Sequence, residues 1–234
     1  MKRPSPADIV LRLALGLAML TPWIARAEND YSVAERALFM ENQIGKLKPP
    51  LTLHYVFRKT GTLEEAFDDK VDLVLTAQAD GACCAVRPQF FTGARAVRQP
   101  EVESAQGNPA ILYFLERDIR EMQRLTKGQP NYFRKRIRMA VYQGATLRDV
   151  SLEYRGKPVD VREFSITPYV DDPMRPRYEK LANKAYVFMM SDAVPGGLYG
   201  IRTRIQGESI EAQPLMVEEM YVEGAAEAVR RRQP

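Results

Sequence analysis

Residues 107–144 constrain the fold most, because their apolar residues recur with helical spacing on both sides of a glycine and a proline. Asn108 offers a side-chain oxygen to the free amides of a helix start, and Pro109 fits the first helical position. The apolar stripe that follows consists of Ile111, Leu115, Ile119, Met122 and Leu125. Gly128 and Pro130 indicate the end of this first helix.

A second helix is predicted directly after Pro130, with Asn131 as its N-cap and Gly144 as its end. Its apolar face consists of Phe133, Ile137, Ala140 and Val141. The tight turn between the two helices predicts a helical hairpin. Because most of the remaining sequence alternates between apolar and polar residues, as β-strands do, we expect this hairpin to lie across a sheet.

The first 27 residues have the pattern of a cleaved secretory signal peptide. Its parts are a basic start with Lys2, Arg3 and Arg12, a short apolar core at 13–20, and the small residues of Ala25-Arg26-Ala27. The alternative is a membrane anchor, but a span needs about 20 apolar residues, and Pro22 and Arg26 interrupt this run too early. No cysteine follows the apolar core, which argues against a lipid anchor. We therefore expect a periplasmic or secreted protein without a transmembrane anchor after cleavage.

Removal of this segment changes the electrostatic character of the chain. It carries four basic residues and one acidic residue, so that 30 basic and 29 acidic residues remain of the original 34 and 30. A net charge near zero gives no case for nucleic acid as a partner. Residues 28–234 contain no obvious linker or repeat and are numerous enough for one core, so we predict a single domain.

The rest of the chain predicts one further helix and a series of strands. A capping box at Ser32 and Glu35 predicts a helix over 33–44 with Val33, Ala37, Met40 and Ile44 on one side. Strands are predicted at 51–58, 71–77, 83–91, 150–154, 158–167, 185–190, 199–205 and 215–222. A slip in the apolar phase near Arg162 indicates a β-bulge in the fifth of these strands.

This order of elements predicts an α+β fold, since consecutive strands with short connections pair antiparallel and the helices are grouped together. We predict one curved antiparallel β-sheet, with a half-barrel as its candidate form. The N-terminal helix and the central helical hairpin are expected to pack on one face of this sheet. The order of elements is similar to that of periplasmic lipoprotein carriers, although no family motif matches.

Residues suited to catalysis are few. His54 is the only histidine, so any Ser–His–acid triad depends on it, and its position opposite Leu53 and Tyr55 on the strand favours a solvent-facing role. The adjacent acids at 68–69, 171–172 and 218–219 are interpreted as solvated loop residues. Gly196-Gly197 lacks the context of a phosphate loop and is interpreted as a turn. We expect neither a cofactor nor a metal site.

Cys83 and Cys84 are the only cysteines and are adjacent in the sequence. As a redox pair they could form a vicinal disulfide, but neighbouring side chains in a strand point to opposite faces, which favours unbridged cysteines. Intermolecular bridging is the third alternative. No C-x-x-C spacing is present that would indicate thioredoxin chemistry or zinc.

The leading functional hypothesis is a non-catalytic periplasmic or envelope binding protein for an apolar or amphiphilic ligand, such as a lipid, or for an envelope protein partner. The ligand is expected between sheet and helices. The candidate site consists of Tyr55, Phe57, Met122, Phe188 and Met190, with Arg134 and Arg136 facing a headgroup. Core packing is the alternative role for each apolar residue, and a solvated helix face is the alternative for the arginines.

Two other classes of function stay open. One is a structural or interaction subunit of an envelope assembly, for which an exposed apolar patch or an unpaired edge strand would argue. The other is a hydrolase, which requires His54 within hydrogen-bond reach of a serine and a carboxylate.

Overall fold

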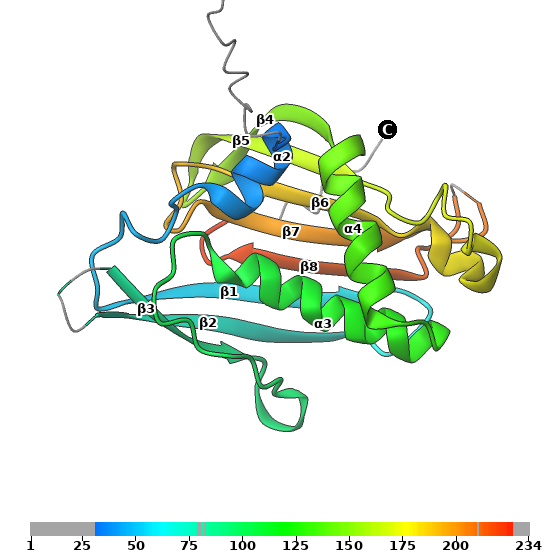
Figure 1. Ribbon diagram of the computed structural model, residues 1–234, viewed down its shortest axis with the longest axis horizontal. Coiled ribbons are helices and arrows are strands. Elements are labelled where there is room, and N and C mark those ends of the chain that lie inside the picture. Colours follow the sequence, from blue (N-terminus) through cyan, green and yellow to red (C-terminus); the bar gives the residue numbers. More distant parts are fainter. Residues whose placement is uncertain (1–30, 79–80, 82, 210, 227–234) are drawn as a thin grey trace, which may run out of the picture. The chain divides into compact units, whose positions relative to one another are not determined.

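A computed structural model describes residues 31–78, 81, 83–209 and 211–226 (Figure 1). The predicted signal peptide lies outside these residues. The strands are β1 (Leu51–Thr60), β2 (Phe67–Ala77), β3 (Cys83–Phe90), β4 (Thr146–Tyr154), β5 (Lys157–Ile166), β6 (Ala185–Met190), β7 (Leu198–Ile205) and β8 (Met216–Val222). The helices are α2 (Val33–Glu35), which continues as the π-helical turn η1 (Arg36–Met40), α3 (Pro109–Thr126) and α4 (Pro130–Gly144). Short 3₁₀ turns occur at η2 (Gly93–Arg95), η3 (Arg175–Arg177) and η4 (Glu179–Asn183).

The strands form one eight-stranded antiparallel sheet in the order β3-β2-β1-β8-β7-β6-β5-β4. Pairing of β1 with β8 joins the three strands before the helical hairpin to the five that follow it. The hairpin α3–α4 therefore connects one edge strand, β3, to the other, β4, and crosses the face of the sheet to do so (Figure 1).

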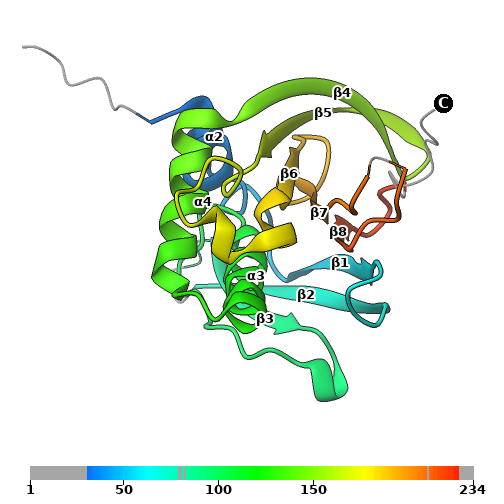
Figure 2. The same ribbon diagram turned by 90° about the vertical axis from the view of Figure 1, so that its right-hand side faces the viewer.

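The sheet is strongly curled but not closed. Figure 2 shows β4 and β5 bending over β6 and β7, with α2, α3 and α4 all on one side of the sheet. The predicted α+β class, with a curved antiparallel sheet and helices on one face, is confirmed.

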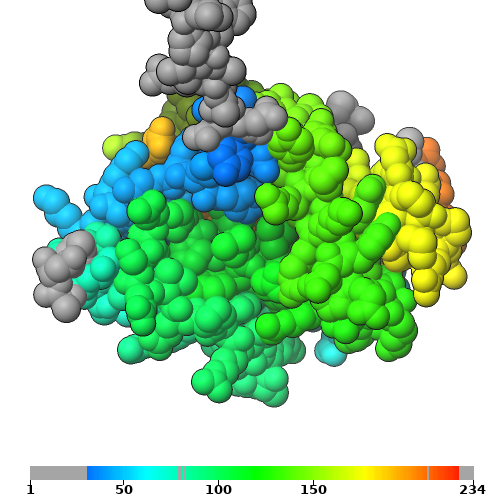
Figure 3. All heavy atoms as spheres, viewed as in Figure 1, coloured from blue at the N-terminus to red at the C-terminus, as the bar shows by residue number. Residues whose placement is uncertain are grey.

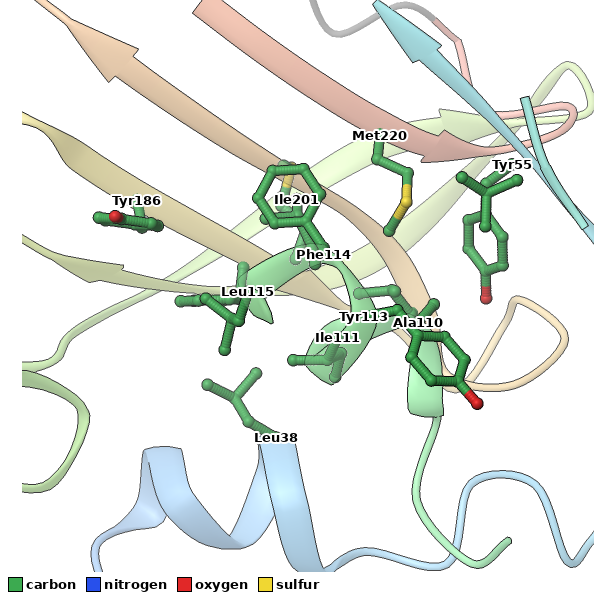
Figure 4. Close-up of a cluster of buried hydrophobic side chains, with 14 of the residues drawn as sticks. Leu38, Tyr55, Ala110, Ile111, Tyr113, Phe114, Leu115, Tyr186, Ile201 and Met220 are labelled. Carbon is green, nitrogen blue, oxygen red and sulfur yellow. The ribbon is translucent and has the colours of Figure 1, made fainter. Parts of the chain in front are cut away.

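The core lies between α3 and the inner face of the sheet. One apolar row crosses five strands, and each of its members, Phe57, Met220, Ile201, Phe188 and Phe164, is paired with the next. None of these side chains is exposed. From the helical side, Phe114 lies beside Ile201 and Met220 of this row, whereas Ile111 and Leu115 lie on the side of α3 toward Leu38 (Figure 4). Burial of such side chains contributes about 1.5–3 kcal/mol each, so this row accounts for the attachment of α3 to the sheet.

The N-terminal helix differs from its prediction. The capping box is present, since Ser32 Oγ accepts from the Glu35 amide and Glu35 Oε2 accepts from the Ser32 amide. The helix ends at Met40 instead of residue 44, because its second part is π-helical and Glu41 is extended. A π-turn contains more residues than an α-turn, so it rotates the apolar stripe. Of the four residues predicted to share one side, Ala37 and Ile44 are buried, whereas Val33 and Met40 are 56% and 47% exposed.

The helical hairpin is present where the sequence predicted it. Asn108 caps α3 by accepting from the Ala110 amide at 3.1 Å. The turn between the helices differs from its prediction at two positions, the end of α3 and the N-cap of α4. The left-handed residue at the end of α3 is Lys127, with φ 57°. The following Gly128 leaves room for the Phe133 ring, which lies 2.5 Å from the position that a Cβ would occupy.

The N-cap of α4 is Gln129, with Pro130 at the first helical position, and not Asn131. The Asn131 side chain instead accepts a hydrogen bond from Arg134 Nη1 within the helix. The predicted bulge near Arg162 is also absent, since β5 pairs with β4 and β6 without a shift of register. Strand β5 instead buries Val161 on one face and Phe164 on the other, which produces the slip in apolar phase.

Cys83 and Cys84 form a vicinal disulfide at the start of β3. Regular alternation would place the two side chains on opposite faces, but the register of β2 and β3 shifts between Thr76 and Ala77, where Ala77 pairs with Cys83. The prediction from alternation therefore does not hold at this position.

Candidate functional site

A buried ionic cluster occupies the space between α3 and the inner face of the sheet, where the sequence predicted a ligand. Asp118 on α3 and Lys184, directly before β6, form an ion pair in which neither side chain is exposed. Tyr186 donates its hydroxyl proton to Asp118 Oδ2 at 2.7 Å. Glu218 on β8, which is equally buried, accepts from Arg117 Nη1 at 2.6 Å and lies 3.8 Å from Lys184 Nζ.

Burial and neighbouring charges shift the pKa values of this cluster in different directions. Desolvation raises the pKa of Asp118 despite the neighbouring Lys184. Desolvation would also raise the pKa of Glu218, but the charges of Arg117 and Lys184 outweigh it and lower that pKa. The pKa of Tyr186 is raised well above its usual value by burial and by the Asp118 carboxylate. The neighbouring cations Arg117 and Lys184 therefore favour the charged form of the Glu218 carboxyl.

The cluster continues along α3 toward the surface. Lys59 on β1 donates to Glu121 at 2.9 Å and also to Glu64, and it lies 3.9 Å from Glu218. Desolvation opposes the charge on Lys59, but the two hydrogen-bonded carboxylates outweigh it and raise the pKa of Lys59. These contacts fasten α3 to β1 and β8 and fill the space between them with charged groups.

The adjacent acids are only partly the solvated residues that the sequence predicted. Asp68 and Asp171 are exposed. Glu218 and Glu219 are 0% and 6% exposed, and Asp172 is 4% exposed. The prediction was wrong for these three. Glu218 and Asp172 each have a partner from a distant part of the chain, which adjacency in sequence does not reveal. Glu219 lies near the hydroxyl of Tyr221, two residues further along β8, which donates to Glu219 Oε1 at 3.4 Å.

The predicted pocket residues do not meet in one cavity. Tyr55, Phe57, Met122 and Phe188 are at most 1% exposed and lie in the core. Tyr55 accepts a hydrogen bond from Asn108 Nδ2 at 2.8 Å, and burial raises its pKa.

Met190 lies apart from the other predicted residues, on a polar pocket of about 730 Å³ beside the turn at residues 191–197. The charged lining of this pocket is mainly acidic, with Glu41, Asp149, Asp160, Asp192 and one arginine, Arg162.

An apolar groove lies on the outside of the helices, between the N-terminal helical segment, α3 and α4 (Figure 3). Its volume is about 360 Å³. We call it the helix groove, and its lining consists of Tyr31, Phe39, Met40, Leu112, Leu115, Ile119 and Ile137, together with Glu35, Glu116, Arg134 and Arg138. Leu112 and Met40 are 54% and 47% exposed, so the groove presents apolar surface to solvent.

The two arginines of the helix groove differ in their partners. Arg134 makes two hydrogen bonds to the Glu116 carboxylate, at 2.7 and 2.6 Å. This pairing lowers the pKa of Glu116. Arg138 is exposed and makes no hydrogen bond or ion pair with any residue that the structure describes. Arg138 therefore supplies a positive charge at the groove that Glu116 does not neutralise.

Arg136, the other predicted headgroup residue, faces away from the groove lining. Its Nε lies 3.0 Å from Asp172 Oδ2 and donates to the Pro168 carbonyl at 3.2 Å. The sequence had singled out Arg134 and Arg136, and the structure shows that both are already paired with a carboxylate. An acid that pairs with an arginine across two helices leaves no local signal in the sequence.

His54 lies on the outer face of β1, as predicted, with Nδ1 2.8 Å from Asp72 Oδ1. The side chain is 51% exposed. Desolvation would raise the pKa of Asp72, but His54 and Lys70 outweigh it and lower that pKa. Within residues 31–226, apart from the four positions that are not described, no hydrogen bond joins His54 to a serine. Among the described residues, His54 therefore has a carboxylate partner but no serine partner.

The described part of the chain contains no group of three or more side chains suited to hold a metal ion. It also contains no helix with the length and apolar character needed to cross a membrane.

No protein-family model and no curated protein matches the sequence. Among solved structures, the crystal structure of the Mycobacterium tuberculosis lipoprotein LppX is similar over 76% of this chain and 87% of its own chain. The sequence identity is 11% and the TM-score is 0.29. At this TM-score the two chain traces agree too loosely for the likeness to bear on function.

Proposed function

We propose that this chain is a non-catalytic binding protein of the cell envelope and that it binds the apolar chain of an amphiphile in the helix groove. The observation that carries the proposal is the exposed apolar lining of that groove, to which three separate helical segments contribute. Soluble proteins rarely expose apolar surface of this kind without a function in binding. The signal peptide predicted at residues 1–27 supports a location in the envelope.

The size and chemistry of the groove favour an aliphatic chain. Its volume of about 360 Å³ lies within the range of small-molecule sites, and its walls are helices whose backbone groups are already hydrogen-bonded. An extended peptide would bring unpaired backbone groups to such walls, whereas an aliphatic chain brings none. The interior of the fold is not proposed as the site, because charged residues and core side chains fill it.

Binding of alkyl phosphates below their micelle concentration tests the proposal. Each buried methylene contributes about 0.8 kcal/mol, so lengthening the chain from decyl to dodecyl should tighten binding about 15-fold. Isothermal titration calorimetry of the purified protein gives this ratio directly. Absence of binding by both probes would contradict the proposal.

A pair of leucine variants locates the site. Leu112→Gln should weaken dodecyl phosphate about fivefold, because it removes about 1 kcal/mol of apolar contact from the groove wall. Leu63→Gln is the matched control, since Leu63 is also exposed, at 40%, but lies outside the groove. Equal weakening by the two variants would show that the probe binds elsewhere.

An interaction subunit of an envelope assembly is the second candidate, favoured by the open edge of β4. On its free side, the described residues give this strand the bridge between Tyr154 and Ala225 and a hydrogen bond from the Tyr199 hydroxyl to the Glu153 carbonyl, both near its C-terminal end. A partner strand could add to such an edge. Hydrogen exchange in the presence of an envelope extract distinguishes the candidates, since protection confined to β4 favours a protein partner and protection of the groove helices favours the ligand.

A further inference from the structure

We infer that Arg138 binds the headgroup of the groove's ligand and that the ligand is therefore a single-chain anionic amphiphile, with a carboxylate or phosphate group. This inference rests on the proposed function, because it assigns the chemical class of the molecule that lies in the helix groove.

The charges on α4 are all positive. This helix carries Arg134, Lys135, Arg136 and Arg138 and no acidic residue. Glu116 pairs with Arg134, and Asp172 pairs with Arg136. An anion at either of these would have to displace a carboxylate that is already in place.

Arg138 presents no such competitor. Arg138 lines the groove one helical turn after Arg134. It directly follows Ile137, which also lines the groove and is 3% exposed. Its guanidinium can bind a carboxylate or phosphate with two parallel hydrogen bonds. An aliphatic chain that lies on Ile137 therefore has a cation within reach of its polar end.

The remaining charge in the lining is Glu35. Its side chain is 8% exposed, and Oε2 accepts from the Ser32 amide at 3.0 Å to close the capping box. This carboxylate is directed to the start of the N-terminal helix, where the helix dipole favours negative charge. Glu35 thus leaves the positive charge of Arg138 without a partner among the described residues.

Three dodecyl compounds with different headgroups test the inference in the purified protein. The probes are dodecyl phosphate, the neutral dodecyl maltoside and the cationic dodecyltrimethylammonium, each titrated below its micelle concentration. The wild-type protein should bind dodecyl phosphate tightest and dodecyltrimethylammonium weakest. Arg138→Gln should weaken dodecyl phosphate about tenfold and leave dodecyl maltoside within twofold, since only the charged contact is lost.

Lys135→Gln is the matched control, because it removes an exposed cation from the same helix but outside the groove lining. It should change the binding of dodecyl phosphate less than twofold, and Arg138→Lys should retain part of the affinity. Equal loss in Arg138→Gln and Lys135→Gln, or equal affinity for the three headgroups, would overturn the inference while leaving the groove as the site. Failure of all three probes to bind would overturn the proposed function and the inference together.

Discussion

Lys184, which directly precedes β6, and Asp118 on α3 form an ion pair that is completely enclosed, with 0% of either side chain exposed. Two buried charges carry a large desolvation cost, which their mutual attraction and their other hydrogen bonds must offset. The pair joins the middle of α3 to the start of β6, so its removal is the most direct test of the ionic cluster.

Lys184→Met should lower the free energy of unfolding by about 3–5 kcal/mol, because it leaves the Asp118 carboxylate buried without its cation. The double variant Asp118→Leu/Lys184→Met should lose less than the single variant, since it removes both charges and leaves apolar groups of similar size. Urea unfolding followed by circular dichroism measures both values. A double variant less stable than Lys184→Met would contradict this account.

The stability of the protein should fall in mild acid because of Glu121. Desolvation would raise the pKa of Glu121, but hydrogen bonds from Arg124 and Lys59 outweigh it and lower the pKa well below its usual value. A carboxyl whose pKa is lower in the folded than in the unfolded state stabilises the fold. This stabilisation is fully present when the pH is above the pKa of the unfolded state, which is about 4.3 for Glu. That stabilisation is lost progressively as the pH falls from about 4 toward the folded pKa.

Urea unfolding at pH 6 and pH 3 measures this contribution. Glu121→Gln should reduce the difference in unfolding free energy between the two pH values, because the substituted side chain does not titrate. Glu65→Gln serves as the control, since Glu65 is an exposed acid in the connection between β1 and β2. The same pH difference in Glu121→Gln as in the wild type would refute the assignment.

Gly196→Ala should lower the free energy of unfolding by more than the cost of placing alanine in a left-handed backbone conformation, because the added Cβ would also clash with neighbouring side chains. Gly196 has φ +74°, and an added Cβ would lie 2.7 Å from Leu53 Cδ1 and 2.9 Å from Asn108 Nδ2. Asn108 also donates a hydrogen bond to the Gly196 carbonyl at 2.8 Å. The substitution would therefore disturb the start of α3 as well as the turn.

Gly156→Ala separates the two contributions. Gly156 has φ +77° but has nothing within 4 Å of its added Cβ, so this variant should lose only about 1–2 kcal/mol from the left-handed conformation. Thermal unfolding should show a larger loss for Gly196→Ala than for Gly156→Ala. Equal losses would mean that Leu53 and Asn108 move aside freely.

The disulfide between Cys83 and Cys84 predicts the labelling behaviour of the two thiols. The denatured protein should take up no maleimide before reduction and two maleimide groups afterwards, as counted by mass spectrometry. Labelling without prior reduction would show that the cysteines are not bonded to one another.

Local sequence signals predicted the features that depend on neighbouring residues. The capping box at Ser32, the cap at Asn108 and the alternation in β1 each involve groups a few positions apart, and each is present. The end of the N-terminal helix was predicted wrongly because the π-helical turn changes the spacing on which the prediction depended.

The buried ionic cluster could not be predicted in the same way. Asp118, Lys184 and Glu218 lie on α3, before β6 and on β8, and only the packing of α3 across the sheet brings them together. The helix groove likewise combines Phe39 with Leu112 and Ile137 from three segments. The sequence identified Arg134 and Arg136 as candidates, but it could not show that both already had a carboxylate partner.

The pairing of β1 with β8 has a consequence for the order of folding. Phe57 pairs with Met220, so one edge of β1 stays unpaired until β8, the last described strand, is in place. Because contacts between such distant residues close large loops, we expect a slow approach to the native state. A nascent or truncated chain that lacks β8 would expose the edge of β1 together with its apolar face, and it would depend on a chaperone to avoid aggregation.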